Sequence, residues 1–357
     1  MKTIKKGKRV LLLMLVVSLV VSLAACGGGG GGTVAYDPDQ TFQLRMSTMA
    51  APNTPLFQAC EWFINRVSEL TGGNVEIQLF PSSQLGDYTS VMSEISLGSI
   101  DLSWESVSAS LDDRLAISGI PYLARSWEET KFVYSMGTWF TDIIGAVAND
   151  LGILHLGGNS SQFMGVGGNN IGNHDYIFDP DVRKDVLLRI APFPMNVWVF
   201  EYLNYNTTVI PFADLYSALQ TGVADCWYGG GVDLNFHGFR DVIRYYAAFN
   251  IAQAYHPLFI SQQTMRRLPE VYQNAIIQAG LEATDEAFRI QMGVEEYYLN
   301  RLIDHGIQIV KPTEEQLDRL AAGMRAEVWP RLAELIGDEL LQGLFDFADQ
   351  MEAYFGR

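Results

Sequence analysis

Three short segments of the chain end in residues that are suited to binding a small molecule. Each set closes a predicted strand: Arg189 at 186–190, Trp104 and Glu105 at 100–104, and Trp227 and Tyr228 at 224–228. Open parallel sheets bind ligands in the crevice outside the carboxyl ends of their strands. We therefore expect these residues to line a binding site.

Arg189 offers the most specific chemistry. A guanidinium presents a planar pair of donors that matches both oxygens of a carboxylate, and it stays charged when it is desolvated. We therefore predict that Arg189 binds the carboxylate of a ligand. The alternative is a structural arginine that pairs with Asp185 or with another carboxylate of the chain.

Other kinds of site have little support in the sequence. The histidines are scattered without a His-x3-His spacing for zinc, and Asp175, Asp179 and Asp181 lack the glycine and glutamate of an EF-hand loop. The glycine-rich segment 165–172 is not followed by Gly-Lys-Ser/Thr, so we expect a flexible surface loop there and no phosphate site. We expect neither a metal nor a cofactor.

The elements that position these residues follow an α/β pattern. Residues 42–46 and 75–80 alternate in the manner of strands, and the apolar residues of 55–70 have helical spacing. Such a β-α-β unit crosses over with a right hand and gives a parallel pair. Helices at 88–97 and 127–149 and a strand at 100–104 extend the unit into an α/β domain.

A second round of alternation begins near Gly152 and predicts a second domain with its own core. Its strands are expected at 153–156, 186–190 and 224–228, and its helices at 195–203 and 215–222. Residues 269–305 then predict a helix about 50 Å long that lies along both lobes, with Gly280 and Gly293 as possible bends. A strand at 307–310 and a helix with a capping box of Thr313 and Gln316 follow.

The N-terminus has the pattern of an export signal. Lysines and Arg9 precede an apolar run, Val10 to Val21, that is too short for a stable transmembrane helix. The run ends in Leu23-Ala24-Ala25-Cys26, which resembles the lipobox at which bacterial lipoproteins are cleaved and lipidated. Cys26 is therefore the expected lipid anchor, and the glycines after it suit a flexible tether. The alternative is an ordinary secreted protein with a chance cysteine.

Charge and cysteine content narrow the function classes. The formal net charge of −17 becomes −22 when the five positive charges of residues 1–25 are removed. Such an acidic chain repels nucleic acid and anionic lipid headgroups, so neither is an expected partner. Cys60 and Cys226 are too few for a disulfide scaffold, and we expect two buried free thiols, with a Cys60–Cys226 bond as the alternative.

Three stretches resemble the solute-binding proteins of tripartite ATP-independent periplasmic (TRAP) transporters, of the DctP type. The stretches are Glu69-Leu70-Thr71-Gly72-Gly73-Asn74-Val75 with Phe80-Pro81-Ser82-Ser83-Gln84-Leu85-Gly86, Leu188-Arg189-Ile190 before a helix, and Leu215 to Asp225. The resemblance implies an α/β, two-lobed periplasmic-binding-protein-like fold with a long helix that spans both lobes. It also implies that Arg189 clamps the ligand between the lobes.

The chain departs from that family pattern at two places. Ser161-Gln162-Phe163 stands where many members have a second arginine, and Cys226-Trp227-Tyr228 stands where a Gly-x-Glu-x-Pro run is frequent. Both changes replace polar groups by aromatic or featureless ones. We therefore predict a monocarboxylate with an apolar or aromatic part, held by Arg189 and by the rings of Trp227, Tyr228 and Phe163, although core packing is the alternative for these rings.

The expected function is an extracytoplasmic, lipid-anchored receptor that closes on a small organic acid and docks on TRAP permease subunits in the membrane. One alternative is a lipoprotein that reports to a membrane receptor. Another is a hydrolase with Glu105 and Asp225 as paired acids. The expected organisation is a signal peptide (1–25), an anchor and tether (26–40), lobe I (41–155 and about 252–268), lobe II (156–251), a spanning helix (269–305) and C-terminal elements (306–357).

Overall fold

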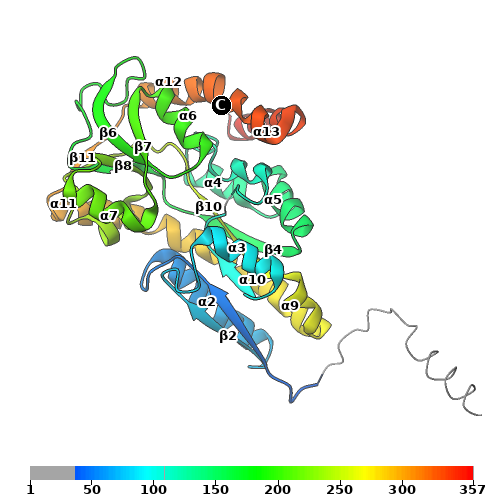
Figure 1. The fold of residues 1–357 in the computed structure, drawn as a ribbon. Helices are drawn as coiled ribbons and strands as arrows, with labels where there is room; N and C mark the ends of the chain where they lie inside the picture. Colours follow the sequence, from blue (N-terminus) through cyan, green and yellow to red (C-terminus); the bar gives the residue numbers. More distant parts are fainter. Residues whose placement is uncertain (1–36, 108, 357) are drawn as a thin grey trace, which may run out of the picture.

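The computed structural model describes residues 37–107 and 109–356, which form two lobes, each built on its own sheet (Figure 1). The sheet of lobe I has the order β2-β1-β3-β10-β4 and consists of β1 (Phe42–Ser47), β2 (Val75–Phe80), β3 (Leu102–Trp104), β4 (Ile153–Ser160) and β10 (Tyr255–Ser261). The sheet of lobe II has the order β11-β9-β5-β8-β6-β7 and consists of β5 (Gly165–Gly168), β6 (Lys184–Ile190), β7 (Tyr205–Val209), β8 (Cys226–Gly230), β9 (Tyr245–Ala247) and β11 (Gln308–Val310). The predicted α/β class is confirmed.

The opening β-α-β unit forms as its pattern predicts. Strand β1 pairs in parallel with β2 and with β3, and helix α2 (Pro55–Leu70) connects β1 to β2. The helix begins with a proline, which is compatible with a first turn because its missing N–H would have no partner there. Its apolar stripe, which includes Phe63 and Val67, is buried against the sheet of lobe I.

Helices pack around both sheets. Lobe I carries α3 (Tyr88–Leu97), α4 (Trp127–Tyr134), α5 (Trp139–Asp150) and α9 (Gln262–Arg267), and lobe II carries α6 (Pro194–Tyr202), α7 (Phe212–Thr221) and the short α8 (Val232–Leu234). The expected single helix at 127–149 is divided, because the chain leaves the helical path between Tyr134 and Trp139 and restarts at a capping box of Thr138 and Thr141. Helices α12 (Glu314–Gly323) and α13 (Ala333–Phe355) end the fold, and the capping box of Thr313 and Gln316 is confirmed.

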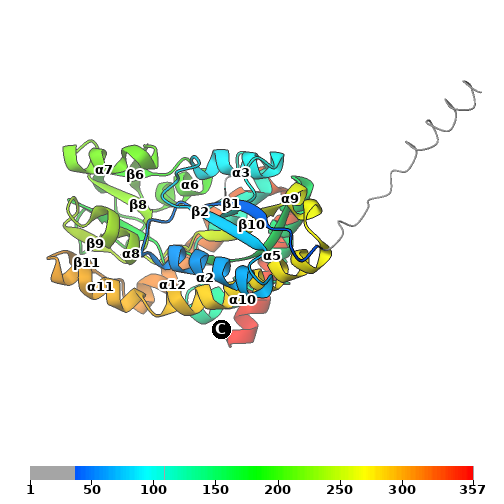
Figure 2. The ribbon, with the colours of Figure 1, turned by 90° about the horizontal axis from the view of Figure 1, so that it is seen from below.

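The predicted spanning helix runs along both lobes but is broken near its end. Figure 2 shows α10 (Glu270–Met292) beneath lobe I and α11 (Glu295–Asp304) beneath lobe II, with the break at Gly293. Gly280 does not bend the helix and instead permits close packing on β4, because a Cβ there would lie 2.7 Å from the Leu156 carbonyl oxygen. The two glycines therefore serve different purposes.

The chain crosses between the lobes later than 155/156. Strand β4 stays paired with β10 up to Ser160, so lobe I includes residues 156–160. Two of the crossing segments are 161–164, between β4 and β5, and 248–254, between β9 and β10, and the chain also crosses between α10 and α11. Strand β11 pairs with β9 and so belongs to the sheet of lobe II.

The glycine-rich segment 165–172 is not the flexible surface loop that we expected. Its first half is strand β5, which is buried between β8 and β9. Glycine is needed because a Cβ at Gly165 would lie 2.4 Å from the Ala247 carbonyl oxygen and one at Gly168 would lie 2.4 Å from the Cys226 Cβ. Small residues here signal the close approach of neighbouring strands.

Candidate functional site

The candidate site consists of residues at the carboxyl ends of strands from both sheets and of a contact between the lobes. In lobe I, β1 ends at Ser47, β3 is followed by Glu105 and β4 ends at Ser160. In lobe II, β6 carries Arg189 one residue before its end. We call the site formed by Ser47, Tyr88, Glu105, Ser160, Arg189 and Phe193 the inter-lobe site.

Arg189 is buried but keeps donors available. Its residue is 2% exposed, and its Nε donates to the carbonyl oxygen of Ile210 at 2.8 Å, just beyond the end of β7. Among the residues that the structure describes, no carboxylate forms a salt bridge with it, and Asp185 pairs with Arg183 instead at 3.4 Å. Burial lowers the pKa of Arg189 to about 10, and the nearby Tyr88 acts in the opposite direction, so the guanidinium stays charged at neutral pH.

Two aromatic rings connect the lobes beside Arg189. Tyr88, the first residue of α3 in lobe I, stacks on Phe193, which precedes α6 in lobe II, with ring centroids 6.4 Å apart and an interplanar angle of 22°. Burial and the neighbouring Asp87 raise the pKa of the Tyr88 hydroxyl to about 12, against the effect of Arg189. Tyr88 therefore lies close enough to Arg189 to sense its charge.

Glu105 supplies a buried carboxyl group on the lobe I side. It is 3% exposed, and neither side-chain oxygen has a hydrogen-bond partner among the described residues. Burial, with a smaller contribution from Asp87, raises its pKa to about 8. The Ser47 hydroxyl and the Met49 amide lie near enough to lower this pKa, but they do not reach hydrogen-bond geometry.

Hydroxyl groups without partners complete this edge of lobe I. The Oγ atoms of Ser47 and Ser160 are buried and have no hydrogen-bond partner in the described part of the chain. Buried polar side chains are nearly always hydrogen-bonded, so such a group at a strand end indicates a ligand or water. No sequence pattern described above indicates Ser47, Ser160, Tyr88 or Phe193 as site residues. The strand-end rule, applied to β1 and β4, would have identified the two serines.

The predicted aromatic residues are mostly core residues. The Trp104 Nε1 donates to Asn159 Oδ1 and to the His256 carbonyl oxygen, both at 3.0 Å, and its ring packs on Phe63. The Trp227 Nε1 donates to Asn235 Oδ1 at 3.2 Å. These contacts favour the core-packing alternative for both indoles.

Tyr228 and Phe163 are also buried. Tyr228 lies 4.8 Å from the Phe200 ring within the lobe II core, and Phe163 lies 5.6 Å from the Trp127 ring in the crossing segment 161–164. The structure corrects the position of Trp227 and Tyr228, because β8 runs from Cys226 to Gly230 and both residues therefore lie within the strand and not at its end.

The acids of the hydrolase alternative lie in different places. Asp225 precedes β8, and its Oδ2 accepts from the Leu187 amide at 2.7 Å, whereas Glu105 follows β3 in the other lobe. The two carboxyl groups are thus not brought together as a pair. Within the described residues no group of three or more histidine, cysteine, aspartate or glutamate side chains is placed to hold a metal ion.

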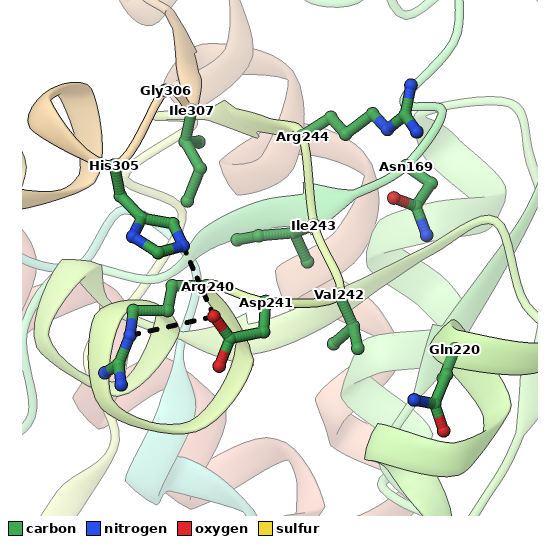
Figure 3. Close-up of a pocket in the computed structure, with 10 residues that line it drawn as sticks. All are labelled: Asn169, Gln220, Arg240, Asp241, Val242, Ile243, Arg244, His305, Gly306 and Ile307. Atoms are coloured by element: carbon green, nitrogen blue, oxygen red, sulfur yellow. Dashed lines mark ion pairs between the residues drawn. The ribbon is translucent and has the colours of Figure 1, made fainter.

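A separate polar pocket lies on lobe II, away from the inter-lobe site (Figure 3). Its volume is about 420 Å³, and it lies between the end of α11, the segment before β9, and α7. His305 and Arg240 both point toward Asp241, and His305 Nε2 lies 3.3 Å from Asp241 Oδ1. None of the predicted site residues lines this pocket.

Two further expectations concern cysteines and membranes. Cys60 and Cys226 are buried free thiols, as expected, and they lie in different lobes. The predicted signal peptide, Cys26 and most of the tether fall outside the described residues. In the part that the structure describes, we find no helix with the length and apolarity needed to cross a bilayer.

Comparison with known proteins places this geometry in a family. Residues 46–334 match the family described as bacterial extracellular solute-binding protein, family 7 (DctP). An uncharacterised protein of Haemophilus influenzae is 24% identical over 306 residues, which cover 84% of this chain and 89% of the relative. The 2,3-diketo-L-gulonate-binding periplasmic protein of Escherichia coli is 22% identical over 74% of this chain and 78% of its own length.

Solved structures share the fold. A TRAP periplasmic solute-binding protein from Ochrobactrum anthropi superposes with a TM-score of 0.78 at 21% identity, covering 88% of this chain and 97% of the other. A TRAP periplasmic solute-binding protein from Roseobacter denitrificans with bound L-galactonate has a TM-score of 0.71 at 21% identity, covering 86% and 99% of the two chains. The chain therefore belongs to the DctP-type family of bacterial extracellular solute-binding proteins, as its sequence motifs indicate.

Proposed function

We propose that this protein is the extracytoplasmic receptor of a TRAP-type importer, which captures a small organic monocarboxylate between its lobes and delivers it to permease subunits in the membrane. The observation that carries the proposal is Arg189, a buried guanidinium beside the other lobe with no carboxylate partner among the described residues. A buried charge needs a counter-charge, because desolvation is not otherwise compensated. A ligand carboxylate provides it.

The contacts between the lobes support capture by closure. Tyr88 of lobe I reaches Phe193 and Arg189 of lobe II, so this wall of the site is complete only when the lobes are close together. A ligand that touches both lobes selects the closed state by its differential affinity for that state. The closed form is then the one that the permease recognises.

The relatives support an organic acid as the cargo. Two of those named above are described with sugar acids, the Escherichia coli protein with 2,3-diketo-L-gulonate and the Roseobacter denitrificans protein with L-galactonate. One clamping arginine suits one carboxylate. We now assign the aromatic wall of the site to Tyr88 and Phe193, because the indoles of Trp104 and Trp227 face the cores.

A carboxylate screen tests this function. The full chain is purified, freed of bound solutes, and its melting temperature is measured with a panel of mono- and dicarboxylates. We expect one class of monocarboxylate to raise the melting temperature of the parent protein and not that of Arg189→Gln. Arg183→Gln is the matched control, because Arg183 is exposed, directly precedes strand β6 and pairs with Asp185. No response to any acid, or the same response in Arg189→Gln, would refute the arginine clamp.

We also propose that Cys26 carries the lipid that holds the receptor at the membrane. The supporting observation is the small-residue sequence before Cys26, followed by a glycine tether. Cells that express the chain are fed a labelled fatty acid and then fractionated. We expect label on the parent protein in the membrane fraction and none on Cys26→Ser. Label that persists in Cys26→Ser would exclude this residue as the anchor.

A further inference from the structure

The lobe I side of the inter-lobe site is acidic. Glu105 is buried there with both oxygens unpartnered, and no salt bridge joins it to a lysine or arginine of the described residues. Asp87, the N-cap of α3, acts on it electrostatically from one side. The thiol of Cys60, on α2, lies on another side and senses the negative charge of Glu105.

Such a carboxyl group is costly to keep in a folded chain. Buried polar groups nearly always have a partner, and a buried charge is tolerated when it is paired and hydrogen-bonded. No described residue partners the carboxyl of Glu105, and the Ser47 hydroxyl beside it is unsatisfied as well. Because Glu105 directly follows β3 at the carboxyl edge of the sheet, its partner is expected to come from the ligand.

The two charged groups of the site belong to different lobes. Arg189 is in lobe II and lies near Tyr88 of lobe I, whereas Glu105 and the nearby Asp87 are both in lobe I. Arg189 and Glu105 do not form an ion pair with each other in the described structure, although Asp87 and Tyr88 are consecutive residues. A ligand between them thus meets a cationic end and an acidic end.

We infer that the cargo is a zwitterion, whose carboxylate binds Arg189 and whose cationic amine binds the carboxylate of Glu105 beside Ser47. The inference rests on the proposed function and narrows its ligand class. A ligand hydroxyl can donate a single hydrogen bond, whereas a cationic amine can donate three and so can reach both unpartnered oxygens of Glu105. The amine favours the ionised form of Glu105, and it makes the ligand neutral overall, so the acidic protein does not repel it.

Matched ligands separate the two possibilities. We would measure by calorimetry the affinity of the full chain for pairs that differ at one group, such as 4-aminobutyrate and 4-hydroxybutyrate, in series with one to five carbons between the ends. α-Amino acids and their α-hydroxy counterparts extend the panel. We expect one amine to bind at least tenfold more tightly than its hydroxyl counterpart, as an amine that pairs with a buried carboxylate should.

Glu105→Gln tests the role of the residue itself, since it keeps the size and removes the charge. We expect this variant to lose at least tenfold in affinity for the amine and to change little for the hydroxyl counterpart. Glu128→Gln is the control, because Glu128 is an exposed glutamate on α4.

Proton release gives a readout that a merely structural role would not produce. At pH 7 the free protein holds Glu105 mostly protonated, and an amine that binds it lowers its pKa and expels the proton. Calorimetry in two buffers with different ionisation enthalpies should therefore show release of close to one proton with the parent protein and none with Glu105→Gln. Asp87 and Cys60 are the other titratable groups that face Glu105, and both variants retain them.

Each outcome has one meaning. Preference for an amine with proton release supports the inference. Tighter binding of hydroxy acids, or amine binding that Glu105→Gln leaves unchanged, overturns the zwitterion but leaves the acid receptor intact. If no carboxylate of either kind binds, the proposed function fails and the inference fails with it.

Discussion

Glu105 should make the stability of the ligand-free protein fall as the pH rises, and the size of the effect follows from its burial. Its pKa is about 8 in the folded protein and about 4.5 when it is solvated. Below pH 4.5 both states hold the proton. Between these values the unfolded chain loses the proton while the folded chain keeps it, so rising pH favours unfolding. Above pH 8 both states are ionised and the penalty stays constant.

Each pH unit within that interval lowers the free energy of unfolding by about 1.4 kcal/mol, and the whole interval by about 5 kcal/mol. Glu105→Gln removes this contribution alone. Urea unfolding would be measured for the ligand-free parent protein and for Glu105→Gln. Between pH 5 and pH 7 the free energy of unfolding of the parent should fall by about 3 kcal/mol relative to that of the variant.

The control for this experiment is Glu128→Gln, whose exposed side chain has no comparable burial. The difference in the free energy of unfolding between Glu128→Gln and the parent should stay constant over the same pH range. If the Glu105→Gln difference is also constant from pH 5 to pH 8, Glu105 is solvated or already paired in the folded protein. The account of an unpartnered buried carboxyl group would then be wrong.

Two further predictions concern packing and closure. Gly165→Ala should lower the free energy of unfolding by about 2 kcal/mol or more, because its Cβ would meet the Ala247 carbonyl oxygen at 2.4 Å. Gly119→Ala has open space around it and should change the free energy of unfolding by less than about 1 kcal/mol. Urea unfolding of both variants measures the two effects. Tyr88→Ala and Phe193→Ala should each weaken binding of the cargo acid. Because the two rings stack, the double variant should lose about 1 kcal/mol less binding free energy than the two single variants lose together. Fully additive losses in calorimetry would show that the rings do not act together.

Local patterns predicted much of the fold because each depends on a short stretch of chain. The alternation at 75–80, the apolar stripe of α2 and the capping box at Thr313 all formed as expected. The prediction of a surface loop at the glycine-rich strand β5 was wrong, because its glycines are required by close packing against strands β8 and β9, which are distant in the sequence. The break at Gly293 was predicted only as one of two possible positions.

The sequence likewise predicted only those parts of the candidate site that depend on local patterns. Arg189 was identified from its place at a strand end, and the structure leaves it without a carboxylate partner among the described residues. Trp227 was misplaced because β8 is shifted by two residues, which puts the indole against Asn235 in the core. Tyr88 and Phe193 were not foreseen, because their contact depends on how the two lobes meet, and no local pattern encodes this.

The central claim is that Arg189 binds a ligand carboxylate, and one calorimetric cycle tests it most directly. The affinities of the cargo acid and of its uncharged carboxamide are measured with the parent protein and with Arg189→Lys, which keeps the charge and loses the planar pair of donors. We predict that the acid loses about tenfold or more in the variant while the carboxamide, already weak, changes little. Equal losses for acid and carboxamide, or no loss for the acid, would contradict the account.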